Sequence, residues 1–163
     1  MKHSKLGGVE KCGGMKKGDG MEPADLAAVV AANHELFLLA NDRLTEVFAE
    51  HRLTPATAHA LWLLDPAQPP PSMKMMAERL YCNASNLTFV TNQLIDRGLA
   101  DRETDPADRR LRVLVLTERG RRVRSEIIGA TLRQTPFAAL DTAEVAQLRA
   151  LLEKALGAGP GSE

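Results

Sequence analysis

The chain has 163 residues, of which 44% are hydrophobic and 26% are charged, as is typical of one globular domain with extensions. The 21 Lys and Arg balance the 21 Asp and Glu, and zero net charge argues at first against a nucleic-acid-binding protein. No unbroken apolar run approaches the roughly 18–20 residues of a membrane helix. No apolar segment of a secretory signal follows the N-terminal lysines either. We therefore expect a cytoplasmic protein that makes no membrane contact.

The charges are unevenly distributed along the chain. Residues 1–20 carry five Lys against two acids, a net of +3, and residues 97–124 carry nine Arg against five acids, a net of +4. All other residues together carry seven bases against fourteen acids, a net of −7. Such asymmetry says more about partners than the total does, and it makes residues 97–124 the expected attractive surface.

The sequence predicts neither a metal site nor an active site. Cys12 and Cys82 lack metal-ligand spacing, and the four His residues never occur at the i, i+4 spacing of a helical zinc pair. The folded part shows no nucleophile with a base, no apolar carboxylate pair and no glycine-rich phosphate loop. We expect no cofactor and no enzymatic activity.

The two ends of the chain are predicted to be disordered. Residues 1–21 hold six of the 12 glycines and few apolar residues, so burial cannot offset the entropy of ordering them. Their lysines could act as a DNA-contacting arm, but an unstructured extension is the preferred interpretation. Residues 158–163 are expected to form a disordered tail.

The first ordered element is a long helix over about residues 24–50. Apolar residues recur at spacings of three and four from Leu26 to Phe48, as in an amphipathic helix. Further apolar residues, such as Leu38 and Leu39, lie off the main stripe. A helix this apolar needs partners on more than one side, which indicates a subunit interface.

Three shorter helices follow. Thr54 and Pro55 begin a helix that runs to about residue 64, and Ser72 caps another over about residues 73–80. After a tight turn, a third runs over about residues 84–97 and ends at Gly98. Two helices joined by so short a turn are typical of a helix-turn-helix.

After Gly98 the pattern changes to that of a β-hairpin. Residues 99–103 and 111–117 favour strands, and residues 105–108 have the composition of a turn. Helices are predicted again over about 118–132 and 141–156, the last with a capping box from Asp141 and Glu144. The predicted fold is mostly α with a small β-hairpin wing, a winged helix-turn-helix.

The predicted helix 84–97 has an inward apolar stripe and an outward polar face. Asn can bond the N6 and N7 edge of adenine, Ser and Thr can contact bases or phosphates, and an exposed Phe can pack on a thymine methyl. An ordinary solvated face is the plainer alternative for such residues. The candidate DNA-binding residues on this helix are Ser85, Asn86, Thr88, Phe89 and Asn92.

The hairpin adds basic residues beside that helix. Arg109 and Arg110 are placed at its tip and Arg112 on its second strand, where an arginine can enter the negative potential of a narrow minor groove. Asp108 is expected to brace Arg110, which leaves Arg109 to reach DNA. Four arginines that open the next helix could hold phosphates or form a solvated face: Arg119, Arg121, Arg122 and Arg124.

Five segments together resemble the MarR family of bacterial transcription regulators: residues 53–55, 82–88, 96–99, 105–110 and 116–120. The resemblance covers about residues 24–157. It implies an obligate homodimer, so that residues 22–157 form one MarR-like domain. Its dimerisation helices would be about 24–50 and 141–156, and its winged helix-turn-helix about 54–117. Base reading is implied for helix 84–97 and wing contacts for Arg109 and Arg110. Phe89 departs from the family, where a small residue is usual, and this leaves the base preference open.

The family resemblance also raises the question of an effector. Relatives often bind small aromatic acids or phenols between the dimerisation helices and the DNA-binding lobe, and others sense oxidants through cysteine. Cys82 precedes a helix N-terminus, which could lower a thiol pKa, but a structural role is the preferred interpretation. The residues that could line an effector pocket are His34, Phe37, Leu38, His59 and Trp62, with core or solvated helix positions as the plainer alternative.

The predicted function is a homodimeric repressor that binds double-stranded DNA at a pseudo-palindromic operator. Two recognition helices related by a dyad should enter successive major grooves about 34 Å apart. A small aromatic or phenolic effector that changes this spacing would release the DNA. A protein-interaction module that uses the same winged helix is the alternative from another function class.

Overall fold

The computed structural model describes residues 22–105 and 108–157. The predicted extension 1–21 with Cys12, residues 106 and 107 of the predicted turn, and the tail 158–163 lie outside the described residues. Contacts divide the chain into two compact units, one ending at Glu35 and one beginning at Leu36. The boundary falls inside the first helix, and the second unit contains every other element.

Helix α1 spans Pro23–Glu50, as its apolar periodicity predicts. Only Leu44 and Phe48 of this helix are buried. By length and composition α1 could cross a membrane, and none of the apolar window is buried. The absence of a long unbroken apolar run did not reveal this property of α1, because mean apolarity over a helix does not require such a run.

Helices α2 (Pro55–Leu63), α3 (Met73–Arg79) and α4 (Ala84–Asp96) follow. Thr54 caps α2 in a capping box with Thr57, and Ser72 caps α3 by accepting the N–H of Met75. Such side-chain oxygens satisfy N–H groups that have no partner within the helix. Gly98, at φ 64°, ends α4 in the left-handed conformation that glycine adopts at low cost.

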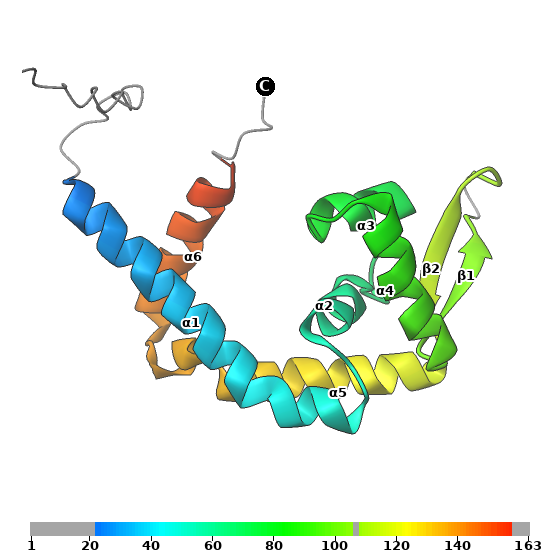
Figure 1. The fold of residues 1–163 in the computed structure, drawn as a ribbon, viewed down its shortest axis with the longest axis horizontal. Coiled ribbons are helices and arrows are strands. Elements are labelled where there is room, and N and C mark those ends of the chain that lie inside the picture. Colours follow the sequence, from blue (N-terminus) through cyan, green and yellow to red (C-terminus); the bar gives the residue numbers. More distant parts are fainter. Residues whose placement is uncertain (1–21, 106–107, 158–163) are drawn as a thin grey trace, which may run out of the picture. The chain divides into compact units, whose positions relative to one another are not determined.

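The strands β1 (Ala100–Thr104) and β2 (Arg112–Leu116) pair antiparallel, with Ala100 opposite Leu116 and Thr104 opposite Arg112. Each is shifted or shortened at its ends relative to the prediction, and Leu99 precedes the strand as a buried core residue. A single bridge joins Ser72 to Val113. Figure 1 shows the hairpin standing beside α4.

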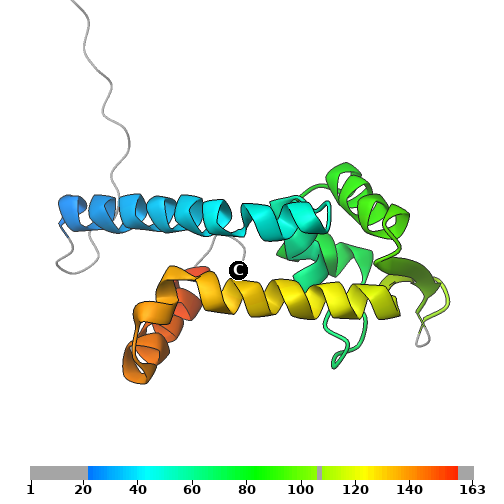
Figure 2. The same cartoon turned by 90° about the horizontal axis from the view of Figure 1, so that it is seen from below.

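Helix α5 spans Glu118–Gln134, a 3-10 helix η1 spans Pro136–Ala139, and α6 spans Thr142–Gly157. The predicted capping box of α6 is present, with each backbone N–H of Asp141 and Glu144 donating to the other's carboxylate at 2.9 Å. The sequence interpretation missed η1 and ended the last helix at residue 156, one residue before Gly157, where α6 ends. Figure 2 shows α5 running away from the hairpin toward η1.

The hydrophobic core lies in the second unit, among helices α2 to α5 and the base of the hairpin. It fixes α4 against β1, so that the polar face of α4 and the hairpin belong to one packed lobe. Its largest fully buried apolar side chains are Leu61, Met76, Leu94, Leu99, Leu114 and Val113.

Candidate nucleic-acid interface and ligand cavities

Helix α4 buries one face and exposes the other. Leu87 and Leu94 of the predicted inward stripe are buried, and Val90 and Ile95 are half-buried. Thr91 is also fully buried, which the sequence interpretation missed because its hydroxyl reads as polar. The five candidate DNA-binding residues of this helix are all exposed: Ser85, Asn86, Thr88, Phe89 and Asn92.

The start of α4 is held by a side-chain cap. Asn83 accepts the backbone N–H of Asn86 through Oδ1 at 2.8 Å. One turn later, the Thr88 hydroxyl donates to the carbonyl oxygen of Ala84 at 2.8 Å. Because this bond uses its only hydrogen, the Thr88 hydroxyl can offer only lone pairs to an outside partner. The N-terminal turns of α4 therefore present small polar groups on a rigid backbone.

Strand β1 contributes a residue that the sequence interpretation missed. Arg102 donates from Nη2 to Thr91 Oγ1 at 3.1 Å and to Asn92 Oδ1 at 3.0 Å. The side chain of Asn92, a candidate base-reading residue, is thus bonded to the wing. When a strand packs on a helix, every second side chain of the strand points toward the helix. This alternation is the only signal in the sequence for the contact between Arg102 and Asn92.

The tip of the hairpin is shaped by Asp108. Its carboxylate accepts the backbone N–H of Arg110 at 2.9 Å, so it contacts the Arg110 backbone rather than the guanidinium. Among the described residues, the structure contains no ion pair for the guanidinium of Arg109 or Arg110. Arg112, in contrast, donates to Thr104 Oγ1 across the strands at 2.7 Å.

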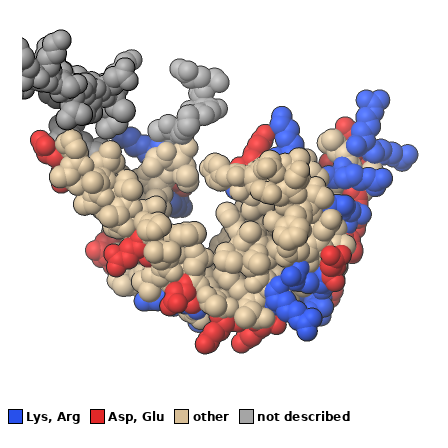
Figure 3. Space-filling view, in the orientation of Figure 1, with Lys and Arg blue, Asp and Glu red and all other residues tan. Residues whose placement is uncertain are grey.

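The arginines that open α5 all have partners within the chain. Arg119 donates to the carbonyl oxygen of Arg97 at 2.9 Å, and Arg121 and Arg122 each lie 3.4 Å from Glu118. Lys and Arg side chains gather over the hairpin and over the adjoining end of α5 in Figure 3. Glu118 therefore partly neutralises Arg121 and Arg122, whereas Arg109 and Arg110 at the hairpin tip have no ion pair among the described residues.

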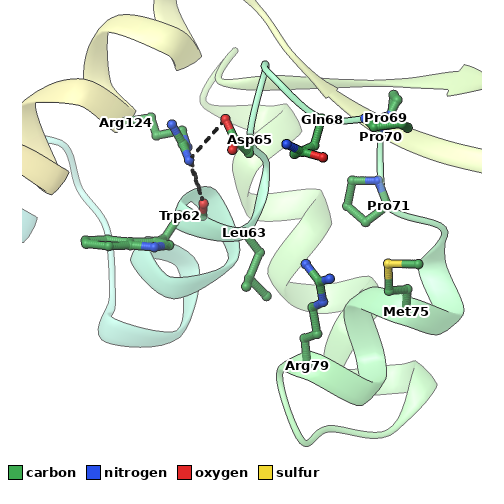
Figure 4. Close-up of a pocket in the computed structure, with 10 residues that line it drawn as sticks. All are labelled: Trp62, Leu63, Asp65, Gln68, Pro69, Pro70, Pro71, Met75, Arg79 and Arg124. Atoms are coloured by element: carbon green, nitrogen blue, oxygen red, sulfur yellow. Dashed lines mark hydrogen bonds and ion pairs between the residues drawn. The ribbon is translucent and has the colours of Figure 1, made fainter. Parts of the chain in front are cut away.

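Arg124 has a structural role. Its guanidinium donates to the carbonyl oxygen of Trp62 at 3.1 and 3.2 Å and lies 3.7 Å from Asp65 (Figure 4). Its side chain is only 16% exposed, too little for a free phosphate contact. These bonds fasten the end of α2 to α5.

Two cavities meet at Trp62. One, of about 230 Å³, lies among α1, α2 and α5 and includes three of the five predicted effector residues, Phe37, His59 and Trp62. His34 and Leu38 do not line it. Its other lining residues are Asn41, Leu44, Phe48, Pro55, Ala58, Ile127 and Thr131. Phe37 and Trp62 are 61% and 37% exposed, so neither is a core residue of this chain.

The second cavity, of about 470 Å³, was not predicted from the sequence. It lies between the end of α2, the proline-rich loop and α3, with the Arg79 side chain and Met75 on one side and Asp65 and Gln68 on the other (Figure 4). Cys82, near the end of α3, is half-buried. Among the described residues, no group of three His, Cys, Asp or Glu is arranged to hold a metal ion.

Several helices expose large apolar side chains. Helix α6 has no buried residue at all, although Leu151 and Leu156 are apolar and 59% and 70% exposed. Leu132 near the end of α5 and Phe137 in η1 are also exposed. On α1 the exposed apolar residues are Leu26, Val29, Val30, Phe37, Leu38 and Leu39.

Comparison with known proteins identifies the lobe. Residues 53–111 match the model of the MarR family. No curated protein matches the chain.

Solved structures match the fold over most of the chain. CouR from Rhodococcus jostii RHA1, bound to p-coumaroyl-CoA, is 20% identical over 87% of this chain and 98% of its own, with a TM-score of 0.66. The transcriptional repressor CouR bound to a 23-mer DNA duplex is 24% identical over 85% and 97%, with a TM-score of 0.62. Wild-type MarR from E. coli is 23% identical over 85% and 99%, with a TM-score of 0.60. The chain therefore matches the MarR family over residues 53–111, which include α2, α3, α4 and β1. Over most of its length it has the fold of these solved structures.

Proposed function

We propose that this protein is a homodimeric repressor that binds a pseudo-palindromic operator in the cytoplasm and is released by a small-molecule effector. The observation that carries the proposal is the exposed polar face of α4 beside a hairpin whose tip arginines, Arg109 and Arg110, have no ion pair among the described residues. Neutral polar groups on a helix discriminate bases, and arginines beside it supply phosphate or minor-groove contacts. The candidate DNA contacts are Ser85, Asn86, Thr88, Phe89, Asn92, Arg109, Arg110 and Arg112.

The exposed apolar residues of α1 and α6 support a homodimer over residues 22–157, with about 24–50 and 141–156 as its dimerisation helices. A large exposed apolar surface marks an interaction site. A membrane is the poorer partner for α1, because Asp25, Glu35 and Asp42 interrupt it and a charge near a bilayer centre costs about 2.5–3.5 kcal/mol. A dyad would place two copies of α4 about 34 Å apart, in successive major grooves.

The cavity at Phe37, His59 and Trp62 is the proposed effector site. It combines aromatic walls with a few polar groups, among them His59 and Asn41, as small-molecule sites do. The relative CouR has been solved with p-coumaroyl-CoA, which supports a phenolic or aromatic ligand here. Reversing the DNA-bound population from 99:1 to 1:99 requires a difference in ligand affinity worth about 5.5 kcal/mol between the two states.

The test is a fluorescence anisotropy titration of the purified protein against duplex DNA from its own upstream region, with a scrambled duplex as control. We expect preferential binding of the upstream duplex. Affinity should fall about 10³- to 10⁵-fold between 50 and 200 mM salt if six to ten phosphates are contacted. Equal binding of both duplexes, or binding that is insensitive to salt, would contradict operator recognition.

The effector part is tested separately by the fluorescence of Trp62, which is the only tryptophan of the chain. A phenolic acid that enters the cavity should change this emission and should lower operator affinity. Phe37→Ala should abolish the fluorescence change without affecting operator affinity in the absence of ligand. A ligand that changes the emission equally in the variant does not occupy this cavity.

A further inference from the structure

The contact between Arg102 and Asn92 constrains how α4 can present its polar face. Arg102 comes from β1 and Asn92 from the middle of α4, and Nη2 of the guanidinium lies 3.0 Å from Oδ1 of the amide. The same Nη2 lies 3.1 Å from the hydroxyl oxygen of Thr91. Both of its N–H groups are thereby used, and the guanidinium is anchored on a residue that is fully buried.

The chemistry of the two groups fixes the orientation of the amide. Arginine has donors and no acceptor, so the amide atom that faces it must be the oxygen and not the nitrogen. One lone pair of Asn92 Oδ1 then accepts the hydrogen bond from Arg102. The other lone pair lies beside the positive guanidinium, which repels the partial positive charge of a second N–H donor. The NH₂ group of Asn92 makes no hydrogen bond within the described residues and is the part of the amide left for an outside partner.

This orientation changes the base that Asn92 can read. A free asparagine bonds adenine with both atoms of its amide, accepting from N6 and donating to N7. With Oδ1 held by a cation, Asn92 is mainly a donor, and the positive charge beside it disfavours the amino group of adenine. Guanine presents two acceptors, N7 and O6, in the major groove and is the base that suits such a group.

We propose that Arg102 is a positioning residue that converts Asn92 from an adenine reader into a donor for guanine, and so sets one base of the operator from the wing. This inference rests on the proposed function, because it requires α4 to enter a major groove. Arg102 would then influence base specificity through Asn92, without touching the base itself.

The experiment is a binding-site selection from a random duplex library with full-length wild type and three variants. Asn92→Ala identifies the operator position that Asn92 reads, as the one where preference disappears. Arg102→Leu frees the amide, and Arg102→Lys retains a donor and a charge facing Oδ1. Anisotropy titrations on operators with G or A at that position then measure the preference of each protein, and thermal melting confirms that each variant is folded.

We expect the wild type and Arg102→Lys to prefer guanine at this position, and Arg102→Leu to shift the G-to-A preference at least about fivefold toward adenine, the lower limit for one bidentate contact. A wild type that prefers adenine, or a Leu variant with unchanged preference at that position, would overturn the role of Arg102. If Arg102→Lys behaves as Arg102→Leu does, the positioning role is equally refuted. A wild type that selects no sequence at all would instead overturn the proposed function.

Discussion

At the scale of single residues, Gly120 shows why one side chain is excluded from this fold. It lies in the first turn of α5, where its N–H donates to the Thr117 hydroxyl at 2.9 Å. A Cβ atom at this position would overlap the backbone carbonyl of Leu99. The first turn of α5 therefore packs directly against the backbone at Leu99, three residues after the end of α4, with no room for a side chain.

Gly120→Ala is expected to destabilise the protein by about 1–3 kcal/mol or more, because a backbone must move to make room. The matched control is Gly129→Ala in the same helix, where the Cβ would meet only the flexible guanidinium of Arg133 at 3.2 Å. That change should stabilise the helix by about 0.5–1 kcal/mol. Urea denaturation of both variants measures the difference, and similar effects of the two would refute the close approach at Gly120.

Arg109 carries the second prediction at this scale. Arg109→Ala should weaken operator binding and leave thermal stability unchanged. The slope of log affinity against log salt concentration should fall by about one, as expected for the loss of one phosphate contact. Arg149→Ala is the control, because this arginine pairs with Glu153 within α6 at 3.3 Å and leaves the wing intact. Anisotropy titrations at several salt concentrations measure both. An unchanged salt slope for Arg109→Ala would mean that the wing tip does not contact DNA.

At the scale of elements, the base of the wing is tied to two helices at once. The Thr117 hydroxyl donates to the carbonyl oxygen of Gly98 at 2.8 Å while it accepts the N–H of Gly120. Arg119 adds a bond to the Arg97 carbonyl. Since α4, the hairpin and α5 share these hydrogen bonds, the hairpin and α4 are positioned as one body.

Thr117→Val should remove the cap of α5 and the link to Gly98, at a cost of about 1–2 kcal/mol in the free energy of unfolding. Thr45→Val is the control, because the Thr45 hydroxyl bonds only the Asn41 carbonyl of its own helix, at 2.9 Å on the surface. Chemical denaturation should show a loss several times larger for Thr117→Val. Equal losses would mean that Thr117 does not link the elements.

At the scale of the whole molecule, the apolar residues of α6 are not buried within the described part of the chain. Helix α6 buries none of its residues, although Leu151 and Leu152 are large and exposed. Burial of one such side chain stabilises an interface by about 1.5–3 kcal/mol. A second copy of the chain is the proposed partner.

The double variant Leu151→Glu with Leu152→Glu should therefore be monomeric and should lose most of its operator affinity, while its core in α2 to α5 stays folded. Sedimentation equilibrium measures the mass, and circular dichroism measures the fold. Met75→Glu is the control for oligomeric state, because Met75 is equally apolar and 42% exposed but lies on α3. A dimeric double variant would show that α6 lies outside the interface.

The parts of this fold that could be predicted from the sequence are those set by residues close together along the chain. The caps at Thr54 and Ser72, the glycine that ends α4 and the capping box of α6 all involve residues within four positions, and each was predictable from the sequence. The 3-10 helix Pro136–Ala139 was missed, because a short turn has neither periodicity nor length to mark it.

Of the candidate site, the exposed face of α4 follows from the sequence by itself, since helical periodicity separates its apolar and polar residues. The sequence by itself also shows that the zero net charge is the sum of an Arg-rich stretch, residues 97–124, and an acidic remainder. Only the tertiary structure showed which of the polar and basic side chains already form hydrogen bonds within the protein. Arg102 reaches Asn92 from ten residues away, and Arg124 reaches Trp62 from 62 residues away. Such contacts depend on how packed elements meet in space, and no local pattern in the sequence encodes that.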